Sequence, residues 1–513
     1  MTELGARSAR RRQRATATAW ARGTDAMASG LLLVNARIRT PAPASAGVEA
    51  VACRGGIIVA VGSNAAARAA APADATIIDG TGTTIVPGFI DPHVHLAALA
   101  AALGAVDCST ARSVEAIVAT LREAAATTPP GAWIRAAGYD ERRLVESRHP
   151  TRWDLDRATT RHPVRLLHRS GHALVLNSRA MALAGITIAS AEPPGGVIER
   201  RLSDGEPTGL LLEMNDALSG AVPPLPRAGL VAGMRGASAL LLQHGVTAVQ
   251  DMTHTNDATA AAFLASLAAE SGFAPRLLPP ATAADGGGAL VKVMVRETGD
   301  RPHPDAEALA ALIRARSRTG QRLAVHAVER RTVTAVVEAY ERAGVGRAGL
   351  RHRIEHAGIC PPDLARRSAA LGLVVVSNPV FLWERGDVYR RTVAERDLPH
   401  LYAVGDLVDA GVTVAAASDA PVARAGPLAG LAAAVSRRSA TGAALPSAGL
   451  AADQALDLYT TAAAVAAGVA DTYGALRAGR PADLVVLRGE PGSPDAVAEM
   501  TIICGRICWA RWA

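Results

Sequence analysis

Two histidines stand one residue apart at the end of an apolar segment that reads Pro87-Gly88-Phe89-Ile90-Asp91-Pro92-His93-Val94-His95. Residues i and i+2 of a β-strand lie on the same face, so His93 and His95 direct both imidazoles to one place. Neutral imidazole is the commonest metal ligand in proteins. Most isolated pairs with this spacing bind nothing, but the preceding Pro-Gly turn and apolar strand favour a metal site here.

Three further apolar segments end in side chains that bind metals. Leu323–His326 and Arg353–His356 each end in histidine, and Val412–Ser418 leads directly into Asp419. Any one of these groups, taken alone, is better explained as a hydrogen-bonded histidine or a helix-capping aspartate. Four strands that end in five such groups favour one shared metal site. The histidines without such a placement are interpreted as surface or core residues: His149, His162, His303, His352 and His400.

The chain has one lysine among 54 basic residues, and this lysine, Lys292, lies within the apolar segment Leu290–Val295. A buried charge costs several kcal/mol unless it is paired or neutralised. Only a primary amine can lose its proton there and react with carbon dioxide to form a carbamate, because a guanidinium stays charged. A carbamate has two oxygens and can bridge two cations. The alternative is a lysine that neutralises an acidic side chain at the end of the sheet.

Charge arithmetic favours two metal ions over one. Two divalent cations carry +4, and a carbamate on Lys292, the Asp419 carboxylate and a bridging hydroxide together subtract three. The residual positive charge would attract a carbonyl oxygen and lower the pKa of bound water towards ~7. This combination predicts hydrolysis by attack of a metal-bound hydroxide.

The elements that would position these groups alternate between short apolar strands and helical segments. Helical periodicity is clear in Val114–Ala126, Pro304–Thr319 and Thr332–Ala343. We predict an α/β fold with a closed (β/α)8 TIM-type barrel, because about eight strand–helix units suit that closure. An open doubly wound sheet is the alternative, but no GxGxxG follows a first strand. The predicted barrel strands are Trp133–Ala137, Val164–Leu167, Val246–Gln250, Leu290–Val295, Leu323–Val325, Arg351–Ile354, Leu373–Val376 and Val412–Ala416.

Both ends of the chain are predicted to contribute short strands to one small composite β-sandwich domain. This domain would comprise residues 29–86 and 466–513, with the metal-binding barrel at 87–465. An insertion at about 180–229 interrupts the barrel pattern with Gly and Pro residues and is expected to cover its mouth. Residues 1–28 are arginine-rich and are interpreted as a basic disordered tail or a misassigned start.

These motifs, in this order, resemble the amidohydrolase superfamily, and most closely its YtcJ-like branch (amidohydrolase 3), which is related to N-substituted formamide deformylase. The resemblance covers roughly residues 30 to 490. The branch-like stretches are Ser170-Gly171-His172-Ala173, Gly205-Glu206-Pro207-Thr208-Gly209, Gly245-Val246-Thr247, Arg353-Ile354-Glu355-His356-Ala357 and Gly479-Arg480-Pro481-Ala482-Asp483-Leu484. The resemblance implies a barrel with a composite β-sandwich and hydrolysis of carbon–nitrogen bonds other than peptide bonds.

The resemblance also implies a role for each candidate residue. His93 and His95 would hold a first metal, and His326 and His356 a second. Lys292, carbamylated, would bridge the two, and Asp419 would bind the first metal and transfer the proton. The chain departs from the branch in having Arg296-Glu297-Thr298-Gly299 where Asp-Gly is common, and Val328-Glu329 near the place of a Gly-Asp. These departures affect the prediction of substrate more than that of metal binding.

Two assignments stay open between alternatives. His172 either donates a hydrogen bond to the developing oxyanion, as a catalytic residue beside Asp419, or packs within its loop. The segment His326-Ala327-Val328-Glu329 also spells HxxE, which suits an aminohydrolase (deaminase) that uses one metal and acts on an amidine or heterocycle. A non-catalytic binding protein is disfavoured, because all six ligand positions are filled.

The composition of the chain limits which binding partners and which cellular location we expect. The chain is 49% hydrophobic and 20% charged, without the ~20 unbroken apolar residues that a membrane span needs. Aromatic residues are 3%, which disfavours nucleic-acid stacking platforms. The five scattered cysteines indicate reduced thiols and a cytoplasmic location. We expect a small-molecule substrate, one or two divalent ions (zinc by default), no other cofactor, no nucleic-acid or membrane partner, and a possible homodimer.

Overall fold

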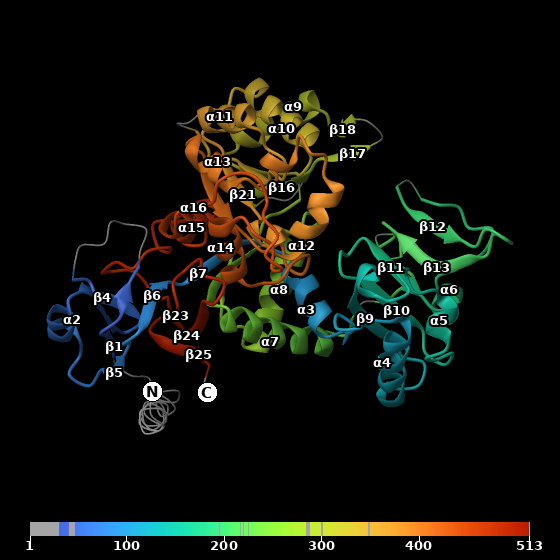
Figure 1. The fold of residues 1–513 in the computed structure, drawn as a ribbon, viewed down its shortest axis with the longest axis horizontal. Coiled ribbons are helices and arrows are strands. Elements are labelled where there is room, and N and C mark those ends of the chain that lie inside the picture. Colours follow the sequence, from blue (N-terminus) through green and yellow to red (C-terminus); the bar gives the residue numbers. More distant parts are fainter. Residues whose placement is uncertain are drawn as a thin grey trace. The chain divides into compact units, whose positions relative to one another are not determined.

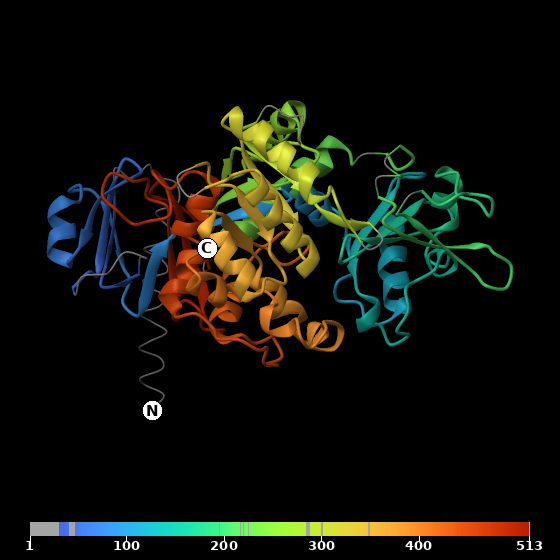
Figure 2. The same ribbon diagram turned by 90° about the horizontal axis from the view of Figure 1, so that it is seen from above.

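The computed structural model describes residues 30–39, 47–193, 195–215, 217–218, 220–223, 225–283, 288–298, 301–346 and 349–511. The predicted N-terminal tail, residues 1–28, lies outside this range. Internal contacts divide the chain into two compact units. The first unit runs as far as His95 and resumes at Ser238, and the second unit comprises Leu96–Ala237. Figures 1 and 2 show the elements of both units.

Eight parallel strands form the centre of the first unit. They lie in a three-stranded sheet of order β15-β14-β7 and a five-stranded sheet of order β16-β19-β20-β21-β22. Their bounds are β7 (Phe89–Val94), β14 (Val246–Asp251), β15 (Arg276–Leu278), β16 (Leu290–Met294), β19 (Arg322–Ala327), β20 (Arg353–His356), β21 (Val374–Ser377) and β22 (Thr413–Ala416). The strands are almost wholly buried, as parallel strands covered on both faces must be.

Backbone contacts link the two parallel sheets at both of their junctions. A parallel bridge joins Thr282 to Val291, and the amide of Asp419 donates to the carbonyl of His93 at 2.9 Å. Within the described residues the strands nevertheless form two sheets rather than one continuous barrel. The α/β class predicted from the sequence is confirmed, with mixed sheets elsewhere in the chain.

Helices connect and cover these strands. In α10 (Arg330–Arg342) the buried residues Val333, Val336, Val337 and Tyr340 follow the 3.6-residue period of one apolar face. The helix packs on β19 beside α9 (Ala306–Arg318) (Figure 1). The remaining helices of this unit are α2 (Asn64–Ala70), α8 (Ala258–Ser271), α11 (Pro362–Ala370), α12 (Pro379–Thr392), α13 (Val404–Asp409), α14 (Pro427–Ser436), α15 (Ala452–Leu458) and α16 (Thr461–Ala467).

Strands from both ends of the chain share one antiparallel-rich region of the first unit. One sheet has the order β4-β3-β1-β5 and the other β2-β6-β23-β24-β25. The pairing of β6 with β23 joins Pro87 to Leu484, which brings residues 397 positions apart side by side (Figure 2). The bounds are β1 (Gly30–Val34), β2 (Arg37–Ile38), β3 (Ala50–Arg54), β4 (Ile57–Gly62), β5 (Thr76–Asp79), β6 (Thr83–Pro87), β23 (Leu484–Arg488), β24 (Val497–Ile503) and β25 (Arg506–Ala510). A short hairpin, β17 (Arg296–Thr298) with β18 (Arg301–His303), follows β16.

The second unit is built on a six-stranded mixed sheet of order β12-β13-β11-β10-β9-β8. Its strands are β8 (Val106–Asp107), β9 (Ile134–Tyr139), β10 (Val164–His168), β11 (Ala173–Leu176), β12 (Val197–Arg200) and β13 (Pro207–Leu212). Its helices are α3 (Leu96–Leu103), α4 (Val114–Thr127), α5 (Arg152–Asp156), α6 (Ser178–Leu183) and the start of α7 (Arg227–Gln243). Separate apolar clusters around Ile117 and Leu174 give this unit its own core.

The second unit accounts for two strands that the sequence pattern assigned to the barrel. The predicted strands Trp133–Ala137 and Val164–Leu167 correspond to β9 and β10, which do not join the eight-stranded array. The array contains β7 and β15 instead. A connection of four residues turns β10 back into β11, and so short a connection requires an antiparallel neighbour. Local strand–helix alternation carries no information on this pairing. The separate unit is accordingly longer than the predicted insertion at 180–229.

Candidate metal centre

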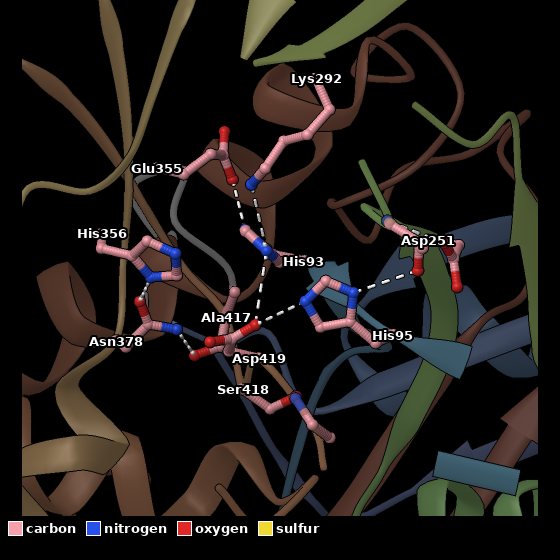
Figure 3. A network of polar contacts seen from close by, with 12 residues as sticks. His93, His95, Asp251, Lys292, Glu355, His356, Asn378, Ala417, Ser418 and Asp419 are labelled. Atoms are coloured by element: carbon pink, nitrogen blue, oxygen red, sulfur yellow. Dashed lines mark hydrogen bonds and ion pairs between the residues drawn. The ribbon is translucent and has the colours of Figure 1, made fainter. Parts of the chain in front are cut away.

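The carboxyl ends of the parallel strands bring the predicted ligands of the first unit together (Figure 3). His93 lies on β7 and His95 one residue beyond it, while Lys292, His326 and His356 lie on β16, β19 and β20. Asp419 follows β22. All parallel strands end at the same edge of a sheet, so side chains at these positions converge although up to 326 residues separate them in the sequence.

His93, His95 and Asp419 form the tightest group. One ligand atom from each lies within 4.8 Å of the others. The Oδ1 atom of Asp419 is 3.1 Å from His95 Nε2 and 3.4 Å from His93 Nε2. This oxygen is buried and accepts no well-formed hydrogen bond from the described residues. An unsatisfied buried carboxylate oxygen facing two imidazole nitrogens fits a divalent cation.

Lys292 and two further histidines extend this group. The Nζ atom of Lys292 is 3.4 Å from His93 Nε2, and its side chain is buried. The ring of His356 lies 5.0 Å from that of His93 and 4.6 Å from that of His326, centroid to centroid. The cluster therefore offers a second pair of imidazoles on the other side of His93, with a primary amine beside it.

Burial lowers the pKa of three nitrogen groups in this cluster, those of His93, His326 and Lys292. Burial, reinforced by the charge of Lys292, lowers the pKa of His93 to about 3. Burial and the neighbouring His356 lower the pKa of His326 well below its usual value. Burial also lowers the pKa of Lys292 to about 8, against the opposing charges of Glu355 and Asp419. Neutral imidazoles have a free lone pair for a metal, and a neutral amine is the reactive form for carbamate formation.

Asp419 is the anion of the group. Burial by itself would raise its pKa, but the close contact with His95 and the charge of His93 outweigh burial and hold the pKa below its usual range. The backbone of Asp419 is left-handed, with φ of 58°, as is that of His356, with φ of 71°. Such conformations cost about 1–3 kcal/mol each and persist where the surroundings impose them, often at functional sites.

A buried carboxylate anchors the Asp419 segment to β7. Asp91 accepts hydrogen bonds from the Ser418 hydroxyl at 2.5 Å and from the amides of Ser418 and His93, both at 3.2 Å. Burial raises the pKa of Asp91 to about 6. Asp91 was present in the motif read from the sequence, but spacing did not reveal this role.

Each of three histidines predicted as ligands has a partner on Nδ1 that was not identified from the sequence. His93 Nδ1 lies 2.5 Å from Glu355 Oε2, and His356 Nδ1 lies 2.7 Å from Asn378 Oδ1. Such partners orient the ring and leave Nε2 for the metal. Thr253 Oγ1 is 3.1 Å from Nδ1 of the third ring, that of His95. Glu355 is part of the motif Arg353–Ala357, whereas Asn378 and Thr253 gave no sequence signal beyond their place after a strand.

Two other residues predicted for the site form polar contacts with near neighbours in their own part of the chain. His172 lies in the second unit, is largely exposed, and has its Nδ1 atom 2.8 Å from Glu213 Oε1. Glu329, the HxxE acid, precedes α10 and accepts a hydrogen bond from the Thr332 hydroxyl at 3.3 Å. The catalytic role of His172 stays a prediction. Among the described helices, none combines the length and apolarity needed to cross a membrane.

The chain is similar to known proteins over most of its length. The model of the amidohydrolase family matches residues 76–508. N-substituted formamide deformylase of Arthrobacter pascens is 31% identical over 80% of this chain and 84% of its own. Putative amidohydrolase YtcJ of Bacillus subtilis is 27% identical over 70% and 74%, respectively. An uncharacterized metal-dependent hydrolase from Pyrococcus furiosus shares the fold, with a TM-score of 0.69 and 23% identity over 90% of this chain and 100% of that chain. With its convergent histidines and this extent of similarity, the chain belongs to the amidohydrolase family.

Proposed function

We propose that this protein is a metal-dependent hydrolase that cleaves a non-peptide carbon–nitrogen bond of a small amide. The observation that carries the proposal is the convergence of His93, His95 and Asp419 within 4.8 Å, beside a buried primary amine. The 31% identical relative is named for deformylation of N-substituted formamides, which makes such formamides the first substrates to test.

The cluster suits two divalent ions, and zinc is proposed because imidazole and carboxylate ligands favour it. His93, His95 and Asp419 would hold the first ion, and His326 and His356 the second. Lys292 would bridge them as a carbamate, formed when its neutral Nζ bonds to the carbon of carbon dioxide and releases one proton. A cation held there supplies a Lewis acid, which polarises a carbonyl oxygen and lowers the pKa of water.

The protein's own groups position and move the proton. Asp419 is a buried carboxylate that faces His93 and His95 and is proposed to accept a proton from the attacking water. It then donates that proton to the departing nitrogen, so that one residue serves as base and as acid. Its pKa is held below the usual range by His95 and His93 against the effect of burial, so Asp419 is ionised before the reaction. His172 is proposed as an oxyanion donor.

The remaining expectations are proposals of the same kind. The eight parallel strands are proposed to act as one (β/α)8 barrel, supported by the contacts at both junctions of the two sheets. The strands at both chain ends are proposed as its composite β-sandwich, with an insertion at about residues 180–229. We further propose a cytoplasmic protein that can form a homodimer, with a small-molecule substrate and no nucleic-acid or membrane partner.

An activity screen of the zinc-loaded protein tests the function. We expect release of amine from N-substituted formamides or other small amides, and loss of that activity after treatment with a chelator. Lactams, esters and amino-heterocycles complete the panel. Release of ammonia from an amino-heterocycle, with one bound ion, would instead favour the aminohydrolase alternative, for which Glu329 is the proton donor. Activity that survives complete metal removal would contradict both.

A further inference from the structure

We propose that Glu355, held in place by Arg353, is a positioning residue that fixes the ring of His93 with its proton on Nδ1 and so sets the strength of the first metal position. The proposal rests on the proposed function, because it assigns a role toward the metal bound there. It concerns residues that ligate nothing themselves and act through the ring of His93 (Figure 3).

Arg353 is fully buried and all of its guanidinium nitrogens are engaged. It donates to both Glu355 oxygens, from Nε at 2.7 Å and from the Nη2 atom at 2.8 Å. The same group reaches Gln250 Oε1 on β14 at 2.8 Å and the Pro92 carbonyl on β7 at 3.1 Å. It therefore connects β20 to two of the three strands of the other parallel sheet and holds the Glu355 carboxylate by both oxygens.

The orientation of Glu355 determines the tautomer of His93. A carboxylate accepts hydrogen bonds and does not donate them, so the ring nitrogen 2.5 Å from Glu355 Oε2 must carry the proton. The lone pair then lies on Nε2, the nitrogen that faces Asp419 and Lys292. Of the three outer partners on ligand histidines, Glu355 is the charged one, while Asn378 and Thr253 are neutral. A charged partner also increases the electron-donating strength of the ring.

Stability alone does not explain a fully buried ion pair at this position. Removing two charges from water costs about as much as, or more than, their attraction returns, so well-packed apolar residues serve folding equally well. The chain contains a suitable control pair, Arg276 with Asp483, whose two hydrogen bonds of 2.7 and 3.0 Å have the same bidentate form. Neither residue of the control pair contacts a predicted ligand in the hydrogen bonds and ion pairs of the described residues.

The test compares Glu355→Gln, Asp483→Asn and the wild type, each prepared metal-free and titrated with Zn²⁺. The Co²⁺-loaded proteins are compared by their visible absorption, which reports the geometry of the ligands. We expect Glu355→Gln to bind one of the ions about 10- to 100-fold more weakly and to shift the Co²⁺ spectrum. We expect Asp483→Asn to leave both readouts at the wild-type values. Unchanged affinity and spectrum in Glu355→Gln would overturn the inference.

A double variant separates positioning from folding. Glu355→Gln leaves Arg353 as a buried unpaired cation, which can itself unfold the protein. Arg353→Met/Glu355→Gln removes both charges, and replacing both partners is often nearly neutral for stability. We expect the double variant to fold and still to bind metal more weakly; wild-type affinity in it would overturn the inference. A wild type that binds no divalent ion would instead refute the proposed function, and so the two failures are distinguishable.

Discussion

Two clusters in the described part of the chain bring histidine and carboxylate side chains within metal-binding range of one another. One is the His93, His95 and Asp419 group in the first unit. The other lies in the second unit and consists of Asp140, Glu141 and His168, whose ligand atoms also lie within 4.8 Å of one another. Distance therefore does not distinguish them, but the hydrogen bonds of their histidines do.

The lone pairs point in different directions in the two clusters. His93 has its Nδ1 on Glu355, which leaves the Nε2 lone pair facing the other ligands. His168 accepts a hydrogen bond on Nδ1 from the Ser170 amide at 3.1 Å, so the proton of the neutral ring is on Nε2, 2.8 Å from Glu141. Arg169 also pairs with Asp140 at 3.1 Å. In the second cluster the lone pair of the histidine is therefore used by a protein group, whereas in the first cluster the Nε2 lone pair of His93 faces Asp419 and Lys292.

The largest expected effect is that of Asp419→Asn in the first cluster. An amide cannot take the proton from water, so we expect kcat/KM to fall by about 10²–10⁴-fold. The amide oxygen can still ligate, so metal content measured by atomic emission should stay close to that of the wild type. Retention of turnover by this variant would remove the proton-transfer role of Asp419.

Lys292→Arg tests whether the first cluster needs a primary amine. A guanidinium keeps the positive charge but forms no carbamate. We expect the variant to bind one ion fewer per chain and to lose most of its activity. The wild type loaded with ¹³C-bicarbonate and Zn²⁺ should show a carbamate carbon signal by NMR, which the variant lacks. Full metal content in Lys292→Arg would show that the bridge is unnecessary.

His352 extends the comparison to a buried histidine whose lone pair is already used. Its Nδ1 accepts from the Leu323 amide at 3.0 Å, and burial, with a smaller contribution from Arg322, lowers its pKa to about 4. The unfolded ring titrates near 6.5, so the unfolded state binds more protons between these values. The free energy of unfolding should therefore fall as the pH falls from about 6.5 to about 4, by up to about 3 kcal/mol from this ring.

Urea unfolding of the metal-free protein at several pH values measures this loss. The His352→Gln variant should show a shallower decline than the wild type over the same interval, with unchanged metal content at neutral pH. An equal decline in the two proteins would mean that His352 is not the group that titrates.

The smallest expected effect is that of Glu141→Gln in the second cluster. The Glu141 and His168 side chains are 20% and 13% exposed, and a partly exposed pair contributes at most about 1 kcal/mol. We expect a change of that size in the free energy of unfolding, and no change in metal content. Loss of a bound ion in Glu141→Gln would break the comparison, because it would make the second cluster a metal site.

The sequence indicated the chemistry of the first cluster more fully than its architecture. Histidines at positions 93 and 95 share a face because the strand period is two, and this can be read from the sequence alone. The sequence could not show which strands belong to the parallel array. Residues 134–139 and 164–168 have the same apolar pattern as barrel strands, and only the turn from β10 into β11 separates them from the parallel array.

The sequence also could not identify the residues that form hydrogen bonds with the predicted ligands. Glu355 lies 262 positions from His93, and no local pattern connects them. Asn378 is 22 positions from His356 and follows an ordinary apolar strand. Side-chain partners at such separations depend on which strand ends meet, and that depends on the pairing of the whole sheet.

The sequence by itself determined which functional groups are available: imidazoles at strand ends, one carboxylate, one primary amine, and membership of a family of hydrolases. The tertiary structure decided which nitrogen of each imidazole has the free lone pair. The reason is physical: the two tautomers of a neutral imidazole differ little in energy, so a hydrogen bond across space selects between them. That is why His93, facing Glu355, is free to bind a cation and His168, facing the Ser170 amide, is not.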